Sequence, residues 1–377
     1  MRKKILILTS KGGNGHLMAS EFLRSILSDY EVITIKAFEE LVQEIDFIRT
    51  FSFEHYDYER LHNLLVQQGW IRTINFIVKT FGHLRYIQFR SFMEKKLFEF
   101  IKKENIDLLI SVIPYINYPA SNAAAKLHIP FLMLCLDADP HLWITDFEKG
   151  IGNTTLIGLP CITSYLFNEM LKKNIDSSRI IEVGFTLRND FFTKKDQQAI
   201  RDQWSIPPNK PIILFMMGGL GSNHQLKFAK ELMKLEFPFH LLMCVGKNES
   251  LIPALEKLSK PDHFSMTIIR FTPHISDLMA ISDLIITKPG PNTCKEALFL
   301  GLPILIDFTQ PTLYWEKRTL DWINLLGTGT VINKLSDLKK ILPTYFAKMD
   351  TPKDTSKLRS LPRFEDSIVN LINKLIG

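Results

Sequence analysis

Cysteine is rare in this chain, and long apolar runs are absent. Only four of the 377 residues are cysteine, and no two of them form a CxxC pair. Each of the four lies in or beside an apolar run: Cys135, Cys161, Cys244 and Cys294. This placement predicts buried thiols in a reducing compartment and argues against disulfides and a zinc site. No run reaches the roughly 18 apolar residues of a membrane-spanning helix, and the run at Lys4–Thr9 is too short for a signal peptide. We therefore expect a soluble cytoplasmic protein, or one that only touches a membrane.

Acidic residues are scarce in one segment of the first half. Nine lysines and arginines between Arg60 and Lys103 stand against only Glu94 and Glu99, so this segment carries the whole positive excess of the chain, whose net charge is +6. Large apolar side chains are interleaved with these cations over residues 45–103. Such a mixture suits an anionic membrane surface, where apolar groups enter the headgroup boundary and cations stay with the headgroups.

Two other interpretations of this basic segment stay open. A pair of amphipathic helices can pack its aromatic residues into the core and leave a solvated basic face. Aromatic residues between cations also suit single-stranded nucleic acid. No recognised nucleic-acid module accompanies the segment, so we expect no nucleic-acid partner.

Short apolar runs alternate with amphipathic helical patterns along nearly the whole chain. This alternation, with 46% hydrophobic residues, predicts an α/β fold with parallel sheets and enough apolar side chains for two cores. The expected strands are 4–9, 31–35, 107–113, 131–136 and 180–183, followed by 212–216, 240–245, 266–270, 284–286 and 303–306. Polar clusters and Pro207-Pro208 place a linker within 189–210. We predict two Rossmann-like domains, 1–188 and 189–355, facing each other across a cleft, and a final helix within 356–377 that can fold back onto the first domain.

A glycine-rich loop follows the first expected strand. It reads Ser10-Lys11-Gly12-Gly13-Asn14-Gly15-His16 and leads into a helical pattern. Glycines at a strand-to-helix turn let the backbone approach a ligand, and a helix N-terminus favours negative charge. The spacing matches neither the dinucleotide fingerprint nor the Walker loop. At the helix entrance, His16 is suited to take a proton from a hydroxyl; a helix-capping or merely exposed histidine explains the position equally well.

The second half opens in the same way. Gly218, Gly219, Gly221 and Ser222 follow the apolar run 212–217 and precede a helical pattern. Their backbone N–H groups and the serine hydroxyl can cradle a diphosphate. A tight turn made only for packing the helix on the strand is the alternative.

A third turn ends the buried run 284–286. Lys288-Pro289-Gly290 follows it, and we expect Asn292 or Thr293 to cap the next helix, which carries Glu296. A carboxylate near that helix start can accept hydrogen bonds from both hydroxyls of a ribose. An acid favoured by the helix dipole is the ordinary alternative.

These pieces occur in the order, and at about the spacing, of the GT-B glycosyltransferases. The chain resembles the branch that holds monogalactosyldiacylglycerol synthases and processive diacylglycerol glucosyltransferases, with the peptidoglycan GlcNAc transferase as a more distant relative. The most specific stretches are 271–279, 282–283, 286–290 and 296–298. The first-half likeness rests on the loop ending in His16, on Asp137 with His141 and Trp143, and on Gly184 with Arg188.

The resemblance implies inverting transfer of a hexose from a UDP-sugar to diacylglycerol or a glycosyl-diacylglycerol at the inner face of the membrane, with no cofactor and no bound metal. It makes His16 the base that deprotonates the acceptor, and Asp137 a residue that orients His16 or the acceptor. The donor-binding residues it implies are Gly13, Gly218, Gly219, Gly221 and Ser222 at the phosphates, Arg188, Phe271 and Ile275 at the uracil, Glu296 at the ribose, and Lys288, Pro289, Gly290, Asn292, Thr293 and Glu316 near the phosphates and sugar.

The chain departs from the family pattern at several positions. Asn14 and Pro291-Asn292 replace family residues, and Trp315 stands where the family's sugar loop has glutamine. The sugar therefore stays undetermined. Asp137-Ala138-Asp139 has the spacing of the metal motif of the other large glycosyltransferase fold, but the resembled family has one aspartate there and needs no metal. Rival functions are a GT-B enzyme with a polyprenyl or soluble acceptor, a UDP-sugar epimerase, and a non-catalytic UDP-sugar-binding regulator.

Overall fold

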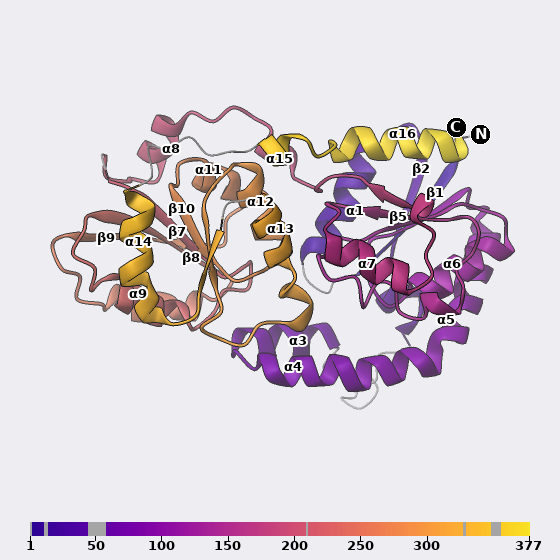
Figure 1. The fold of residues 1–377 in the computed structure, drawn as a ribbon, viewed down its shortest axis with the longest axis horizontal. Helices are drawn as coiled ribbons and strands as arrows, with labels where there is room; N and C mark the ends of the chain where they lie inside the picture. Colours follow the sequence, from indigo (N-terminus) through magenta and orange to yellow (C-terminus); the bar gives the residue numbers. More distant parts are fainter. Residues whose placement is uncertain (1, 11–13, 44–57, 209, 327–328, 348–355) are drawn as a thin grey trace. The chain divides into compact units, whose positions relative to one another are not determined.

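The computed structural model describes residues 2–10, 14–43, 58–208, 210–326, 329–347 and 356–377. The chain divides into two compact units. Residues 1–61, 75–188 and 359–377 form the first, and residues 62–74 and 189–358 form the second. Each unit is built on a six-stranded sheet with helices against it, as Figure 1 shows for each in turn. Every strand pairing in both sheets is parallel. The predicted α/β class is confirmed.

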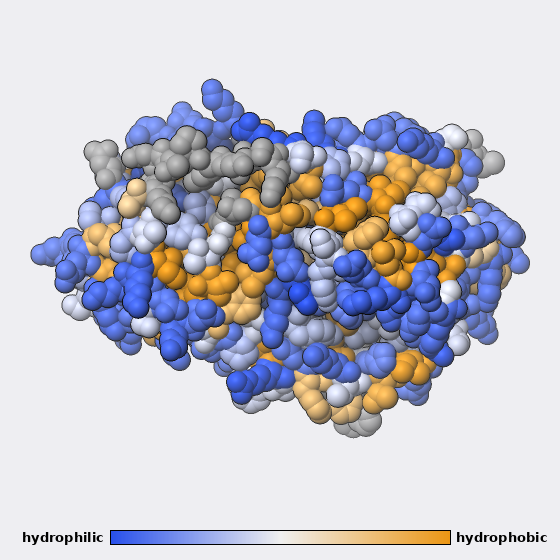
Figure 2. All heavy atoms as spheres, viewed as in Figure 1, coloured by the Kyte–Doolittle hydropathy of each residue, from blue (hydrophilic) through white to orange (hydrophobic). Residues whose placement is uncertain are grey.

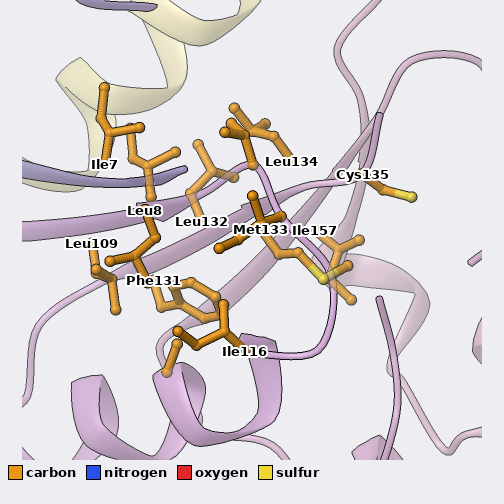
Figure 3. Packing of buried hydrophobic residues seen from close by; sticks show 14 of the residues in the cluster. Ile7, Leu8, Leu109, Ile116, Phe131, Leu132, Met133, Leu134, Cys135 and Ile157 are labelled. Atoms are coloured by element: carbon orange, nitrogen blue, oxygen red, sulfur yellow. The ribbon is translucent and has the colours of Figure 1, made fainter. Parts of the chain in front are cut away.

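The first sheet has the order β2-β1-β3-β4-β5-β6. Its strands are β1 Lys4–Thr9, β2 Glu31–Lys36, β3 Leu108–Ser111, β4 Phe131–Leu134, β5 Thr155–Leu159 and β6 Ile180–Glu182. Parallel strands covered on both faces are apolar at every position, and in Figure 3 Leu132 and Leu134 lie on one side of β4 while Phe131 and Met133 lie on the other. Strand β5 is missing from the sequence prediction. Its Gly158 interrupts the apolar run because a Cβ there would lie 2.6 Å from Leu134 Cδ2.

Helices cover both faces of the first sheet. They include α1 Asn14–Ile26, α5 His83–Glu104, α6 Asn117–Lys126, α7 Ser164–Lys172 and α16 Phe364–Ile376, and α5 is preceded by α3 Tyr58–Gln67, α4 Ile71–Ile77 and the π-helix η3 Val78–Gly82. The predicted final helix is α16, and it places Phe364, Ile368 and Ile372 in the core of the first unit. The chain entering α16 runs against Gly184, whose φ is +84° and whose Cβ would lie 2.0 Å from the Pro362 carbonyl oxygen.

The second sheet has the order β12-β11-β10-β7-β8-β9. Its strands are β7 Ile212–Met216, β8 Phe239–Gly246, β9 Phe264–Arg270, β10 Leu284–Thr287, β11 Ile304–Asp307 and β12 Gly329–Ile332. Its helices include α8 Gln197–Gln203, α9 Gln225–Leu232, α10 Ile252–Glu256, α11 Ile275–Ala280, α12 Pro291–Phe299, α13 Thr319–Leu326 and α14 Leu338–Phe346. The four-residue strand β12 is missing from the sequence prediction. The strand is short and only partly buried, so the sequence has no apolar run there that would predict it.

The stretch expected to be a linker packs onto the second unit. It contains α8, and the Ser276 hydroxyl of α11 donates to Asp190 at 2.6 Å. Lys195 pairs with Asp277 of the same helix at 2.6 Å. These contacts attach the stretch after Arg188 to the wall of the second unit.

Each sheet has one point where the strand order reverses. In the first sheet the neighbours at that point are β1 and β3, and in the second they are β7 and β10. Ligands of open α/β sheets bind outside the carboxyl ends of the strands at this switch point. The two switch points are therefore where functional side chains are expected.

The four cysteines are buried and unpaired, as the sequence predicts. Among the helices of the described residues, none has both the length and the apolar composition needed to cross a bilayer.

Candidate functional site

His16 stands at the switch point of the first sheet. It lies in the first turn of α1, directly after β1, and its Nδ1 is 2.6 Å from the carbonyl oxygen of Val112, the residue that follows β3. A carbonyl oxygen can only accept, so Nδ1 carries the hydrogen in this contact. In the neutral ring Nε2 then has the lone pair. This is the tautomer that a proton acceptor needs.

Trp143 connects His16 to Asp137. Its indole N–H donates to Asp137 Oδ2 at 2.9 Å, and its ring is tilted against the His16 ring with the centroids 6.0 Å apart. Trp143 is 1% exposed, so packing fixes both contacts. The structure thus brings Asp137 and Trp143, both in the loop after β4, together with His16, which follows β1, across the end of β3.

The two carboxylates of the Asp137-Ala138-Asp139 stretch have different partners. Asp137 accepts from Trp143, whereas Asp139 accepts from the backbone N–H and from Nδ1 of His141, the latter at 2.7 Å. Bonds to Asp139 raise the pKa of His141, and the second carboxylate, Glu169, adds to the effect. His141 is therefore part of an ion-pair cluster with Asp139 and Glu169.

The turn after β7 has the shape that its glycines permit. Gly218 and Gly221 have φ of +76° and +70°, which side chains rarely adopt. A Cβ on Gly221 would lie 2.1 Å from the Val245 carbonyl oxygen, and one on Gly218 would lie 3.4 Å from Lys288 Cε. Gly219 accepts from the Lys247 N–H at 2.9 Å. The turn is therefore held close to the ends of β8 and β10.

Gln225 fixes this turn, although no sequence motif marks it. Its side-chain oxygen accepts from the Ser222 N–H at 3.0 Å, and its amide donates to the Cys244 carbonyl at 2.8 Å. The residue is fully buried. A glutamine at the first position of a helical pattern looks like a surface residue, and only its contact with β8, 19 residues away, shows otherwise.

Lys288 and Glu316 form an ion pair at the switch point of the second sheet. Lys288 follows β10, and its Nζ is 2.7 Å from Glu316 Oε1. The Glu316 side chain is 9% exposed and the Lys288 side chain 30% exposed. Gly290 lies beside both, because a Cβ there would be 3.4 Å from Lys288 Cε and 3.8 Å from Glu316 Oε1.

A third ionisable residue, His62 of α3, lies near this pair. Burial lowers the pKa of His62, and the Lys288 charge lowers it further, while Asn63 and Glu316 oppose the shift. Its sequence position gave no indication of this neighbourhood, since α3 lies in the basic segment of the first half of the chain.

The predicted cap of α12 is wrong. The helix begins at Pro291 with Gly290 as its N-cap, and no side chain caps it. Proline fits the first helical position, which leaves Asn292 and Thr293 in the first turn. There the backbone N–H groups of an α-helix have no carbonyl partner within the helix. Glu296, 8% exposed, lies on the next turn of the same helix.

The remaining predicted residues lie as follows. Phe271, between β9 and α11, is 51% exposed, with the Lys247 ammonium 5.3 Å from its ring centroid. Ile275 begins α11, and Pro289 is buried between β10 and α12. Arg188 is the last residue of the 75–188 segment of the first unit. Gly13 lies outside the described residues.

Comparisons with known proteins show similarity to glycosyltransferases. Residues 209–308 match the glycosyltransferase family 28 C-terminal domain. The processive diacylglycerol β-glucosyltransferase of Bacillus pumilus is 25% identical to the chain, over 89% of this chain and 85% of the relative. The enzyme of the same description from Staphylococcus saprophyticus is 24% identical, over 98% and 93%. Among solved structures, MurG of Acinetobacter baumannii has a TM-score of 0.65 at 14% identity and covers 99% of both chains.

The predicted GT-B fold and the predicted resemblance are confirmed. The chain has this fold, its residues 209–308 match the glycosyltransferase family 28 C-terminal domain, and it is similar to the processive diacylglycerol β-glucosyltransferases over most of its length.

Proposed function

We propose that this protein transfers a hexose, with inversion, from a UDP-sugar to diacylglycerol or a glycosyl-diacylglycerol at the cytoplasmic face of a membrane. The observation that carries the proposal is the second switch point, where the glycine turn after β7, the Lys288–Glu316 pair and the start of α12 meet. The similar enzymes from Bacillus and Staphylococcus are named for glucosyl transfer to diacylglycerol, which supports the lipid acceptor.

The donor is held by the second unit in this proposal. The turn Gly218–Ser222 and the first turn of α12 offer backbone N–H groups to the two phosphates. Lys288 adds a cation beside them, and Glu296 accepts from the ribose hydroxyls. Phe271 and Ile275, together with Arg188, bind the uracil. The fixed backbone dipoles and Lys288 would stabilise the negative charge of the departing UDP, the role that a bound metal ion has in other enzymes.

The acceptor is activated by the first unit. His16 Nε2 removes the proton of the lipid hydroxyl, and the oxygen attacks the anomeric carbon of the sugar. The bond between that carbon and the phosphate oxygen breaks, and UDP leaves with the bonding electrons. The Val112 carbonyl holds the productive tautomer, and Asp137 acts through Trp143 to fix the ring.

A panel of UDP-sugars offered with diacylglycerol vesicles tests the proposal. We expect one sugar to give a new glycolipid by mass spectrometry, with release of UDP. The His16→Ala variant should give none, while His128→Ala, an exposed histidine of the same unit, should match the wild type. A UDP-sugar that is isomerised without transfer, or bound without reaction, would refute the proposal in favour of an epimerase or a regulator.

An exposed apolar stripe supports the membrane-facing part of the proposal. One face of α5 packs Tyr86, Met93, Leu97 and Ile101 into the core, which confirms part of the amphipathic-helix interpretation. Four apolar residues from α4 to the first turns of α5 are 44–61% exposed: Phe76, Phe81, Leu84 and Ile87. Their helical spacing puts them on one stripe, and Figure 2 shows apolar side chains at the surface over α4 and the start of α5, bordered by hydrophilic residues. Phe47, Phe51 and Phe53 of this segment lie outside the described residues.

Vesicle co-sedimentation tests this stripe. Burial of each large apolar group contributes about 1.5–3 kcal/mol, so Phe81→Ser with Leu84→Ser should reduce binding to anionic vesicles about 10-fold or more. Leu171→Ser changes an exposed leucine of α7, 42% exposed, and should leave binding unchanged. Equal loss in both variants, or no binding by the wild type, would contradict the membrane assignment.

A further inference from the structure

A histidine, a threonine and an aspartate form a buried cluster beside the glycine turn of the second unit. His224 immediately precedes α9, and its Nε2 is 2.7 Å from Thr309 Oγ1. Thr309 Oγ1 lies 2.6 Å from Asp307 Oδ1 at the end of β11, and Asp307 Oδ2 is 3.8 Å from His224 Nε2. The His224 side chain is 10% exposed and the Asp307 side chain 5% exposed. The backbone N–H of His224 also donates to Ser222 Oγ at 3.2 Å.

The hydrogens in this cluster can be assigned. The Asp307 carboxylate only accepts, and it takes both the Thr309 N–H and the single hydroxyl hydrogen of Thr309. Thr309 Oγ1 must therefore accept from His224, so Nε2 carries a hydrogen. In the neutral ring the lone pair is then on Nδ1. Within the described part of the chain, no residue forms a hydrogen bond with His224 Nδ1.

The charges around His224 favour a neutral ring until another anion arrives. Burial lowers the pKa of His224, Lys227 of α9 lowers it further, and Asp307 opposes the shift. Burial also raises the pKa of Asp307, although its bonds to Thr309 and the nearby His224 act in the other direction. Phe228 of α9 contributes only its ring edge, with the centroids 5.2 Å apart. Asp307 is thus the one anion that faces this imidazole among the described residues.

We propose that His224 is a ligand of the donor diphosphate that takes up a proton when the nucleotide binds, with Asp307 as its positioning residue. This inference rests on the proposed function, because it needs a nucleoside diphosphate at the Gly218–Ser222 turn. Only Asn223 separates His224 from that turn, and the Ser222 hydroxyl already accepts a hydrogen bond from the His224 backbone.

The proton balance of this step is simple. A bound diphosphate adds negative charge beside a buried imidazole, and an anion within hydrogen-bond reach favours the charged ring. Nδ1 accepts one proton from solvent and donates it in a hydrogen bond to a phosphate oxygen. Asp307 and Thr309 keep the opposite nitrogen engaged throughout. When the bond to the sugar breaks, the added charge on the leaving UDP lies next to this imidazolium, which stabilises it without a cation from solution.

Calorimetric titration with UDP in two buffers of different ionisation enthalpy, at a pH where free UDP is fully ionised, counts the protons taken up. We expect the wild type to take up a large fraction of one proton. His224→Gln should take up none and bind UDP about 10- to 100-fold more weakly, the loss expected for a charge-assisted hydrogen bond. Thr309→Val and Asp307→Asn should reduce the uptake, because each weakens the support of the charged ring.

His240→Gln is the matched control. His240 is a second buried histidine of the same unit, at the start of β8, and both its nitrogens bond hydroxyls, those of Ser265 and Thr267. Its replacement should leave the proton uptake at the wild-type value, and thermal unfolding should show that all variants fold. UDP binding with the same uptake in wild type and His224→Gln would overturn this inference and leave the proposed function standing. No UDP binding by the folded wild type would instead overturn the proposed function.

Discussion

The two switch points of the molecule are built in different ways. The first presents a single imidazole, held by one carbonyl oxygen and a tilted indole. The second is assembled from backbone turns, a paired lysine and glutamate, and buried polar clusters that tie three strand ends together. A constant, highly charged nucleotide needs many fixed donors, whereas a proton acceptor needs only one well-oriented atom. The difference predicts that changes at the first switch point affect turnover, and that changes at the second switch point affect donor binding.

The largest effect is expected at His16. His16→Ala removes the proton acceptor, so turnover should fall by about 100-fold or more, the usual contribution of general-base catalysis. The Michaelis constant for the donor should change little. Initial rates at saturating donor check this, with His128→Ala as the control. Normal turnover in His16→Ala would show that the first switch point takes no part in the reaction.

Within the second switch point, substitutions in the glycine turn should have the largest effect on UDP binding. Gly221→Ala forces a Cβ to within 2.1 Å of the Val245 carbonyl oxygen at a φ of +70°, so either the turn or β8 must move. We expect loss of UDP binding and a lower melting temperature. Gly69→Ala is the matched control, because Gly69 has a φ of +77° but no atom within 4 Å of the added Cβ. Equal effects in the two variants would show that backbone strain alone matters at this turn.

Substitutions at the Lys288–Glu316 pair can distinguish an effect on stability from an effect on donor binding. Lys288→Met leaves a buried carboxylate unpaired, which destabilises the unit, and removes a cation from the phosphates. We expect UDP affinity to fall about 10-fold. The double variant with Glu316→Gln should recover the melting temperature but not the affinity. Recovery of both would mean that Lys288 acts only through the pair.

The sequence predicts the strands and turns that local pattern specifies. Ten of the strands are readable because each is a short apolar run, and the glycine turn after β7 is readable because several glycines follow such a run. The cap of α12 was mispredicted because Pro291 takes the first helical position, which puts the N-cap at Gly290, two or three residues before the predicted caps. Gln225 and His224 could not be recognised, since their partners lie 19 and 85 residues away and exist only after the sheet has formed.

The smallest effect on activity is expected at His240, at the opposite end of the second sheet from His224. Burial, helped by Lys210 and Arg201, lowers the pKa of His240 to about 4 from 6.5. Because the folded pKa is below the unfolded one, the unfolded state binds the proton first, and stability falls as the pH drops from 6.5 towards 4. This histidine should cost about 2 kcal/mol at pH 5 relative to pH 8. Denaturant unfolding of wild type and His240→Gln should show a smaller acid loss in the variant; identical pH profiles would contradict the assignment.

We assign donor binding to the second switch point and proton removal to the first. Calorimetric titration of UDP into wild type, Glu296→Ala and His16→Ala tests this assignment most directly. Glu296 lies in α12 at the second switch point, so its truncation should weaken UDP binding about 10-fold or more through the lost ribose hydrogen bonds. His16→Ala should bind UDP as the wild type does. Undiminished binding by Glu296→Ala, or loss of binding by a folded His16→Ala, would contradict the account.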